Sequence, residues 1–310
     1  MKTLIIGASG FVGHYLIKQL AIKGWPAVAT CLPSEDLEAD IPVYKLDILC
    51  PQEIEDVLLS EKPEAIIHLA AQSSVSVSWK EPALTVDVNI KGAVNLLETV
   101  RKTDDSVRIL LIGSGEQYGF VPEDHMPINE DEPQNPGNIY AMTKCAQDIL
   151  GALYARSYGM DIVRARAFNH IGPGQSPLFV ISDFCKQVAL LEKSKGPCTM
   201  KVGNLAAERD FTDVRDVVRA YILLCEKGQK GESYNIGSGS AVSIGKLLEK
   251  ILSYANKNIL IEIDQEKFRP LDLPIIEADI SKLTKDTGWR PEHNLDNTIL
   301  ETLNYWRNNC

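Results

Sequence analysis

The feature that most constrains the fold is a glycine-rich turn near the N-terminus. Gly7, Gly10 and Gly13 stand at three-residue intervals directly after the apolar run 3–6, and the apolar residues of 12–20 then recur every four positions, as on one helix face. A glycine turn between a strand and a helix lets backbone approach a pyrophosphate, with the helix N-terminus facing its charge. We therefore expect a dinucleotide at this turn; the alternative is a plain tight turn. The expected contacts come from Gly7, Gly10, Phe11, Val12 and Gly13.

Short apolar runs alternate with helix-length segments through the first half of the chain. Parallel strands need crossover helices, and such helices cover both faces of the sheet. The alternation therefore predicts an α/β fold: a doubly wound parallel sheet of the Rossmann type, followed by a smaller mixed α/β lobe for the substrate. The expected strands are 3–6, 27–31, 43–46, 65–70, 108–112 and 161–167.

The pattern loosens after about Phe168, where the glycines and prolines of 171–177 indicate a loop. We expect residues 1–168 to form the NAD(P)-binding domain, with 212–237 returning to it. The second lobe is expected to comprise 169–211 and 238–310, with a cleft between the two. The helices expected beyond Phe168 are 180–191, 213–226 (capped by Thr212), 244–255, 280–286 and 295–306.

The composition excludes several classes of function. The 310 residues carry 32 basic and 42 acidic side chains, a net charge of −10, so we expect neither nucleic acid nor an anionic membrane as a partner. No apolar run approaches the roughly 20 residues that span a bilayer. The seven cysteines are odd in number and lack a Cys-x-x-Cys pair, and the five histidines share no ligand spacing. We therefore expect free thiols, a cytoplasmic location and no metal.

The choice of dinucleotide depends on the end of the second strand. NAD-preferring folds usually place a carboxylate there for the ribose 2′-hydroxyl. Here Thr30 and Cys31 end the strand, and no acid follows until Glu35. This favours NADP(H), with NAD(H) as the alternative, although no lysine or arginine lies nearby for a 2′-phosphate. Thr30 is expected at the cofactor. Asp47 and Ile48 are expected at the adenine; the alternative for Asp47 is a solvated turn.

Tyr140 and Lys144 are four residues apart, which places a phenol and an ammonium on one helix face. An adjacent cation stabilises a phenolate, so the pair is suited to acid–base chemistry. Ser114 follows an expected strand at the edge where ligands bind in a doubly wound sheet, and its hydroxyl is suited to hold a carbonyl oxygen beside Tyr140. The alternatives are a surface tyrosine and a serine that caps a turn.

Further segments give the chain a family resemblance. They are His68–Ser73, Asn89–Gly92, Asn169–Gln175, Gly203–Leu205, Arg209–Val214 and Arg269–Asp272. Together with the glycine turn and the Tyr140–Lys144 pair, they resemble the nucleotide-sugar branch of the extended short-chain dehydrogenase/reductase family. The resemblance implies that Leu69, Ala70 and Ala71 line the cofactor and that Asn89 supports Lys144 through water. It also implies that Ser73, Asn169, Lys186, Arg209 and Arg269 bind the nucleotide sugar, the two arginines at its diphosphate.

Within that branch the segments are similar to the reductases of GDP-4-dehydro-6-deoxy-D-mannose. The resemblance implies hydride transfer from NAD(P)H to carbon 4, giving GDP-D-rhamnose, with Tyr140 as proton donor, Ser114 on the ketone and Lys144 at the nicotinamide ribose. Glu116 leaves GDP-mannose 4,6-dehydration open, since dehydratases use a glutamate there as a base, and epimerisation is a further alternative. A more remote alternative is a non-catalytic protein that senses a dinucleotide. A homodimer is expected, as in relatives.

Overall fold

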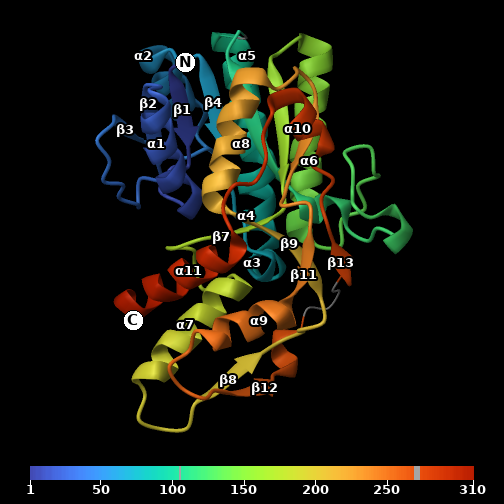
Figure 1. Cartoon of the computed structure of the whole chain (residues 1–310). Helices are drawn as coiled ribbons and strands as arrows, with labels where there is room; N and C mark the ends of the chain where they lie inside the picture. The colour runs from blue at the N-terminus through green and yellow to red at the C-terminus, as the bar shows by residue number, and fades with distance from the viewer. Residues whose placement is uncertain (105, 269–272) are drawn as a thin grey trace.

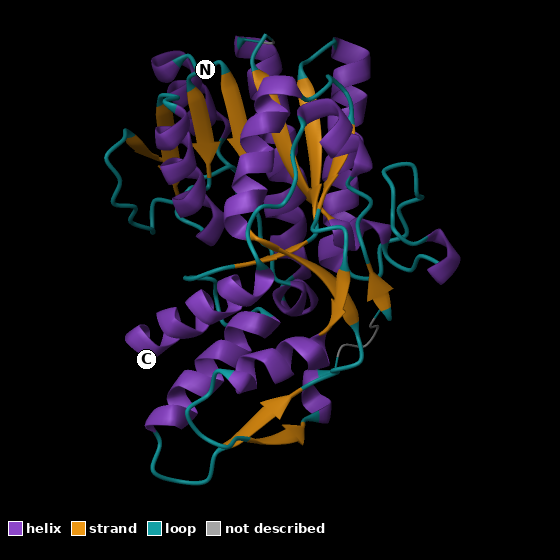
Figure 2. Ribbon diagram, viewed as in Figure 1, coloured by secondary structure: helices purple, strands orange, loops and turns teal. Residues whose placement is uncertain are grey.

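The computed structural model describes residues 1–104, 106–268 and 273–310. At its centre is a seven-stranded sheet in the order β10-β6-β5-β4-β1-β2-β3, with every neighbouring pair parallel (Figures 1 and 2). This confirms the expected doubly wound α/β fold. The strands are β1 (Thr3–Ile6), β2 (Ala27–Cys31), β3 (Val43–Lys45), β4 (Ala65–His68), β5 (Arg108–Ser114), β6 (Ile162–Ala167) and β10 (Ser233–Ile236).

Both faces of this sheet are buried because adjacent residues of its strands are apolar. Leu4 and Ile5 point to opposite faces and belong to different core clusters. Helices α1 (Phe11–Lys23), α8 (Val214–Lys227) and α10 (Ser281–Thr287) cover one face. The other face is covered by α2 (Pro51–Glu61), α5 (Gly92–Thr103) and α6 (Ile139–Tyr158).

A second group of elements has its own apolar core below the sheet in the view of Figure 1. Strand β9 lies at the centre of a small sheet, pairing with β7 and β13 in parallel and with β11 antiparallel. The bounds of the elements are β7 (Asn169–Ile171), α7 (Val180–Lys193), β8 (Thr199–Val202), β9 (Glu208–Asp213), β11 (Ala241–Ser243), α9 (Ile244–Ser253), β12 (Leu260–Ile263), β13 (Ile275–Ile276) and α11 (Leu295–Asn309).

Some boundaries differ from the sequence-based expectation. Asp213 rather than Thr212 caps α8: its carboxylate accepts a 2.7 Å hydrogen bond from Arg215 N, while Thr212 remains in extended β9. Strand β5 continues to Ser114, two residues further than expected. Residues 82–103 form three consecutive helical elements, which are α4 (Pro82–Val86), a π-helical turn η1 (Asp87–Lys91) and α5. Short elements complete the chain: α3 (Val75–Lys80), η2 (Gly115–Tyr118), η3 (Glu123–His125) and η4 (Gln265–Lys267).

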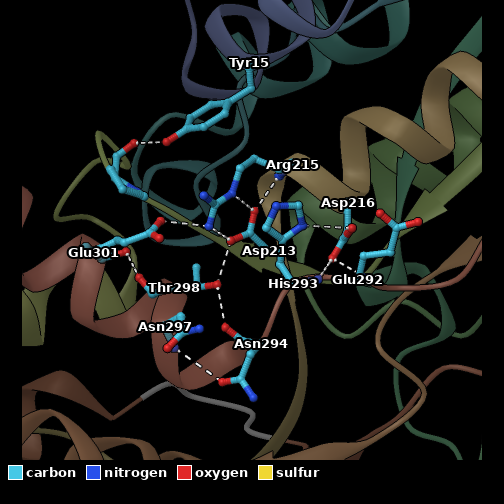
Figure 3. A network of polar contacts seen from close by, with 12 residues as sticks. Tyr15, Asp213, Arg215, Asp216, Glu292, His293, Asn294, Asn297, Thr298 and Glu301 are labelled. Atoms are coloured by element: carbon cyan, nitrogen blue, oxygen red, sulfur yellow. Dashed lines mark hydrogen bonds and ion pairs between the residues drawn. The ribbon is translucent and has the colours of Figure 1, made fainter.

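A polar network joins α8 to the C-terminal segment (Figure 3). The buried carboxylate of Asp213 accepts hydrogen bonds from Arg215 and, at 2.6 Å, from Thr298 Oγ1 in α11. Arg215 also forms an ion pair of 2.8 Å with Glu301 in α11. The fully buried Asp216 accepts hydrogen bonds from the backbone N–H groups of Glu292 and His293. These contacts fix α11 and the chain before it against the sheet domain.

Candidate active site

Two positions of the glycine turn accommodate only glycine, one because of its backbone conformation and its neighbours and the other for lack of space. Gly7 has a φ of 83°, and a Cβ there would lie 2.6 Å from Ala70 Cα. A Cβ on Gly13 would lie 2.1 Å from the Ala8 carbonyl oxygen. Gly10 differs: it is the N-cap of α1, and a Cβ there would meet only the Gly7 carbonyl oxygen, at 3.8 Å. The first turn of α1, which includes Phe11 and Val12, therefore begins beside open space that suits a phosphate.

Two neighbouring strands hold this turn in place. Gly7 N donates to Thr30 Oγ1 (3.2 Å) and Ala8 N donates to Thr30 O (2.7 Å), so the buried Thr30 supports the turn from β2. Beyond β4, Leu69 N and Ala70 N both donate to Ile6 O at 2.9 Å, which brings Ala70 against Gly7. Leu69, Ala70 and Ala71 therefore lie at the carboxyl edge of the two central strands, where doubly wound sheets bind ligands.

The expected adenine residues lie between β3 and α2. Asp47 Oδ1 accepts a 2.9 Å hydrogen bond from Leu49 N, and Asp47 N donates to Glu53 Oε2, so Asp47 shapes the turn into α2. Ile48 is buried, and a Cβ on Gly92 would lie 2.8 Å from its Cγ2. The adenine role of both residues stays a prediction.

Ser114, Tyr140 and Glu116 come together at the end of β5. Ser114 caps η2, its Oγ accepting from Glu116 N at 3.2 Å, and its side chain also hydrogen-bonds to Tyr140. Asn138, the N-cap of α6, donates from Nδ2 to Glu116 Oε2 at 3.1 Å. The expected hydroxyl, phenol and carboxylate therefore share one site, and α6 carries the phenol in its first turn.

Burial is the main influence on the ionisation of both Tyr140 and Lys144. Burial raises the pKa of Tyr140 to about 12; the hydrogen bond with Ser114 opposes this, and the charge of Glu116 adds to it. Lys144 is buried as well, and its Nζ donates to Ile112 O (2.8 Å) and Gln147 Oε1 (3.0 Å). Burial lowers the pKa of Lys144 to about 7. The phenol is therefore protonated at neutral pH, as a proton donor must be.

A hydrogen-bonded chain behind the site was not expected from the sequence. Asn89, in the π-helical turn, accepts from Gln72 N (2.8 Å) and donates to Gln72 O (3.0 Å) and Thr143 Oγ1 (2.9 Å). Thr143 Oγ1 in turn donates to Tyr140 O at 2.7 Å. The resemblance implies that Asn89 supports Lys144 through water, and that role stays a prediction; its direct contacts join the chain after β4 to α6. Single π-turns inside helices are frequent at functional sites.

The residues expected at the substrate are spread over several elements. Asn169 begins β7 and pairs with Phe211 of β9, two residues from Arg209. The buried Arg209 donates from Nη1 to Leu273 O (2.7 Å) and Glu208 O (2.8 Å), so β9 and the chain before β13 orient its guanidinium. Ser73 is exposed between β4 and α3. Lys186 lies in α7 with Nζ 5.1 Å from the Trp306 ring centroid, and Arg269 lies outside the described residues.

Comparison with known proteins identifies the family. A family model described as GDP-mannose 4,6 dehydratase matches residues 4–302. The chain belongs to the GDP-mannose 4,6 dehydratase family. The GDP-6-deoxy-D-mannose reductase of Pseudomonas aeruginosa is 33% identical over 98% of this chain and 97% of the relative. GDP-mannose 4,6 dehydratase 2 of Arabidopsis thaliana is 31% identical over 93% of this chain and 82% of the relative.

Two solved structures have the same fold over nearly the whole chain. RMD from Pseudomonas aeruginosa, complexed with NADPH, has a TM-score of 0.89 and 33% identity, covering 100% of both chains. Thermus thermophilus UDP-glucose 4-epimerase, in complex with NAD, has a TM-score of 0.88 and 28% identity, covering 99% of both. The comparisons confirm an NAD(P)-dependent enzyme of the extended short-chain dehydrogenase/reductase type, among the nucleotide-sugar reductases, dehydratases and epimerases.

Two further buried residues, Gln147 and His68, lie beside Lys144. Gln147 accepts a hydrogen bond from Lys144, and its position three residues further along α6 could have indicated the contact. His68 is buried beside Lys144: burial and the lysine charge lower the pKa of His68 to about 3, so it is neutral. In the described ranges no helix is both long and apolar enough to cross a membrane.

Proposed function

We propose that this member of the family is a reductase that transfers a hydride from NAD(P)H to carbon 4 of GDP-4-dehydro-6-deoxy-D-mannose, giving GDP-D-rhamnose. The observation that carries the proposal is Tyr140, buried, protonated at neutral pH and hydrogen-bonded to Ser114 at the carboxyl edge of β5. The similarity to the Pseudomonas aeruginosa reductase over 98% of the chain supports it.

The chain's own residues would stabilise the charge on the ketone oxygen and protonate it. The bound dinucleotide supplies the hydride, with NADP(H) favoured and NAD(H) as the alternative. Ser114 donates a hydrogen bond to the ketone oxygen and stabilises the charge that develops there. Tyr140 gives its hydroxyl proton to that oxygen and regains a proton from solvent. Lys144 holds the nicotinamide ribose and lowers the cost of the transient phenolate.

The glycine turn and the second lobe would hold the two nucleotides. Gly10 and the first turn of α1 receive the pyrophosphate of the dinucleotide, because a side chain at Gly10 would occupy that space. The GDP-sugar would lie over β7 and β9, with Arg209 at its diphosphate. The other proposed contacts of the sugar nucleotide are Ser73, Asn169, Lys186 and Arg269.

Dehydration of GDP-mannose is the second candidate, and Glu116 favours it. Its carboxylate is close enough to raise the pKa of Tyr140, and Asn138 holds it toward the site. A carboxylate in that position could take a proton from carbon 5 after oxidation at carbon 4. Dehydration needs Tyr140 to act first as a base, and the raised pKa of Tyr140 opposes that step.

One experiment separates the two candidates. Purified protein is given GDP-4-dehydro-6-deoxy-D-mannose with NADPH or NADH, and separately GDP-mannose without a reductant. A reductase consumes the reduced dinucleotide in the first assay and leaves GDP-mannose unchanged in the second. Formation of a 4-keto sugar nucleotide from GDP-mannose would instead establish the dehydratase. Tyr140→Phe should abolish either activity, because both need the phenol.

We also propose a homodimer formed through α5 and α6, in the cytoplasm, where the seven free cysteines would stay reduced. The outer side of α6 is apolar and exposed: Met142, Ile149, Leu153 and Tyr158 are 40–53% accessible. Ile149→Glu combined with Leu153→Glu should give a monomer by light scattering. Leu260→Glu, at an exposed leucine of β12, should leave the dimer intact.

A further inference from the structure

The chain after β2 folds back onto the glycine turn. Glu35 N donates to Leu32 O at 3.0 Å, forming a tight turn just past Cys31. The Glu35 carboxylate then accepts hydrogen bonds from Ser9 Oγ at 2.5 Å and from Leu32 N at 3.3 Å. An acid four residues beyond the strand end is therefore held by the glycine turn itself, beside the proposed dinucleotide site.

A lysine reaches the same turn from the neighbouring strand. The parallel pairing of β2 with β3 sets Lys45 opposite Cys31. Its ammonium donates to the Glu35 carbonyl oxygen and, at 3.2 Å, to Asp36 Oδ1. The sequence-based statement that no lysine lies nearby is therefore wrong, because strand pairing brings together residues that are ten or more positions apart. Lys45 is exposed, so it can turn toward an anion without a large desolvation cost.

We propose that Glu35 and Lys45 together set the choice between NADH and NADPH. A carboxylate at the end of the second strand accepts hydrogen bonds from the ribose 2′-hydroxyl of NADH and repels a 2′-phosphate. A nearby ammonium attracts that phosphate. NADH binds while the Glu35 carboxylate keeps its hydrogen bond with Ser9. NADPH binds when that hydrogen bond breaks and the Lys45 ammonium faces the 2′-phosphate. This inference rests on the proposed function, because it needs a dinucleotide on the glycine turn.

The test measures binding to the full-length protein, freed of bound nucleotide, without any sugar substrate. Isothermal titration with NADH, NADPH and adenosine 2′,5′-bisphosphate gives the Kd of each ligand. Removing one repulsive charge corresponds to about a tenfold gain in affinity for the 2′-phosphate ligands. Glu35→Gln should therefore tighten NADPH and the bisphosphate about tenfold and weaken NADH. Lys45→Gln should weaken NADPH and the bisphosphate and leave NADH within about twofold.

Glu38→Gln is the matched control, because Glu38 is an exposed acid in the same segment and its substitution changes the net charge equally. It should leave the ratio of the two Kd values unchanged. The inference is overturned if Glu35→Gln leaves that ratio within about twofold of the unsubstituted protein, or if Glu38→Gln shifts it as much. Binding of neither dinucleotide would overturn the proposed function as well. Binding of both with a ratio insensitive to Glu35 would overturn this inference alone.

Discussion

Lys144 donates a 3.0 Å hydrogen bond to Gln147 Oε1, and both side chains are almost completely buried. The Lys144 ammonium also donates to the Ile112 carbonyl oxygen at 2.8 Å, so both of these acceptors are neutral. An ammonium removed from water and held by neutral groups loses its proton easily, and burial accordingly lowers the pKa of Lys144 to about 7. The charge in the site therefore changes within the physiological range of pH.

Gln147→Glu should move the pH dependence of the reaction upward. A carboxylate in place of the amide stabilises the ammonium and raises the pKa of Lys144. The loss of kcat/KM that accompanies deprotonation of Lys144 should therefore begin about one pH unit or more higher than in the unsubstituted enzyme. Rates measured from pH 6 to 9.5 test this. Gln52→Glu, an exposed site on α2, makes the same change in net charge and should not shift the profile. Superimposable profiles for Gln147→Glu and the unsubstituted enzyme would contradict the prediction.

Gly10→Ala should mainly reduce dinucleotide affinity, whereas Gly13→Ala should mainly reduce stability. A Cβ on Gly10 finds open space, whereas a Cβ on Gly13 lies 2.1 Å from the Ala8 carbonyl oxygen. Gly10→Ala should therefore keep its stability within about 1 kcal/mol and lose dinucleotide affinity by more than about tenfold. Gly13→Ala should lose about 2 kcal/mol or more of unfolding free energy, because backbone must move. Urea unfolding and dinucleotide titration of both variants test the difference. Equal destabilisation of the two would disprove it.

The glycine turn and the Ser114–Tyr140 pair could be predicted because local rules place them. The spacing of the glycines fixes a strand–turn–helix, and the carboxyl ends of parallel strands meet at one edge of the sheet. The contacts of Asn89 could not be predicted, since they depend on how the π-helical turn packs against Gln72 and Thr143. The position of Glu35 could not be predicted either, because it lies four residues beyond the strand and only a tight turn returns it to Ser9.

The cap of α8 shows why helix boundaries are harder to predict than helices. Thr212 and Asp213 are both good N-cap residues, so the sequence alone does not separate them. The pairing of β7 with β9 extends through Asp213, and the extended chain places that carboxylate, not the Thr212 hydroxyl, under the first turn of the helix. Tertiary pairing therefore decided between two residues of similar local preference.

Asn89→Ala should reduce both stability and activity. The substitution removes hydrogen bonds to both backbone groups of Gln72 and to Thr143, leaving buried polar groups without partners. We expect a loss of about 2–4 kcal/mol in unfolding free energy. We also expect a lower kcat, because Thr143 Oγ1 hydrogen-bonds to the Tyr140 carbonyl oxygen and helps to position that residue. Thr143→Val removes the hydrogen bond from Asn89 and the one to Tyr140 O but keeps the shape and the contacts of Asn89 with Gln72, so its loss should be smaller. Denaturant unfolding and steady-state rates provide the measurement; an effect of Thr143→Val that exceeds that of Asn89→Ala would contradict it.

Asp213→Asn should destabilise the protein at neutral pH and much less in acid. Burial acts to raise the pKa of Asp213, but hydrogen bonds from Arg215 and Thr298 outweigh it and hold that pKa below its ordinary value. A carboxyl whose pKa is lower in the folded than in the unfolded state adds stability above its unfolded pKa of about 4, and this contribution disappears as the pH falls through the folded pKa. Breaking a buried ion pair typically costs about 3–5 kcal/mol, and about 2–3 kcal/mol is expected here because Arg215 keeps Glu301.

The measurement for Asp213 is urea unfolding of the substituted and unsubstituted proteins at pH 7 and pH 3. The difference between them should shrink in acid, where the unsubstituted Asp213 loses its advantage over asparagine. Asp296→Asn serves as the control, since that carboxylate is half exposed in α11 and its ion pair with Lys250 is worth under about 1 kcal/mol. A difference for Asp213→Asn that stays constant between the two pH values would mean that shape, rather than charge, joins α8 to α11.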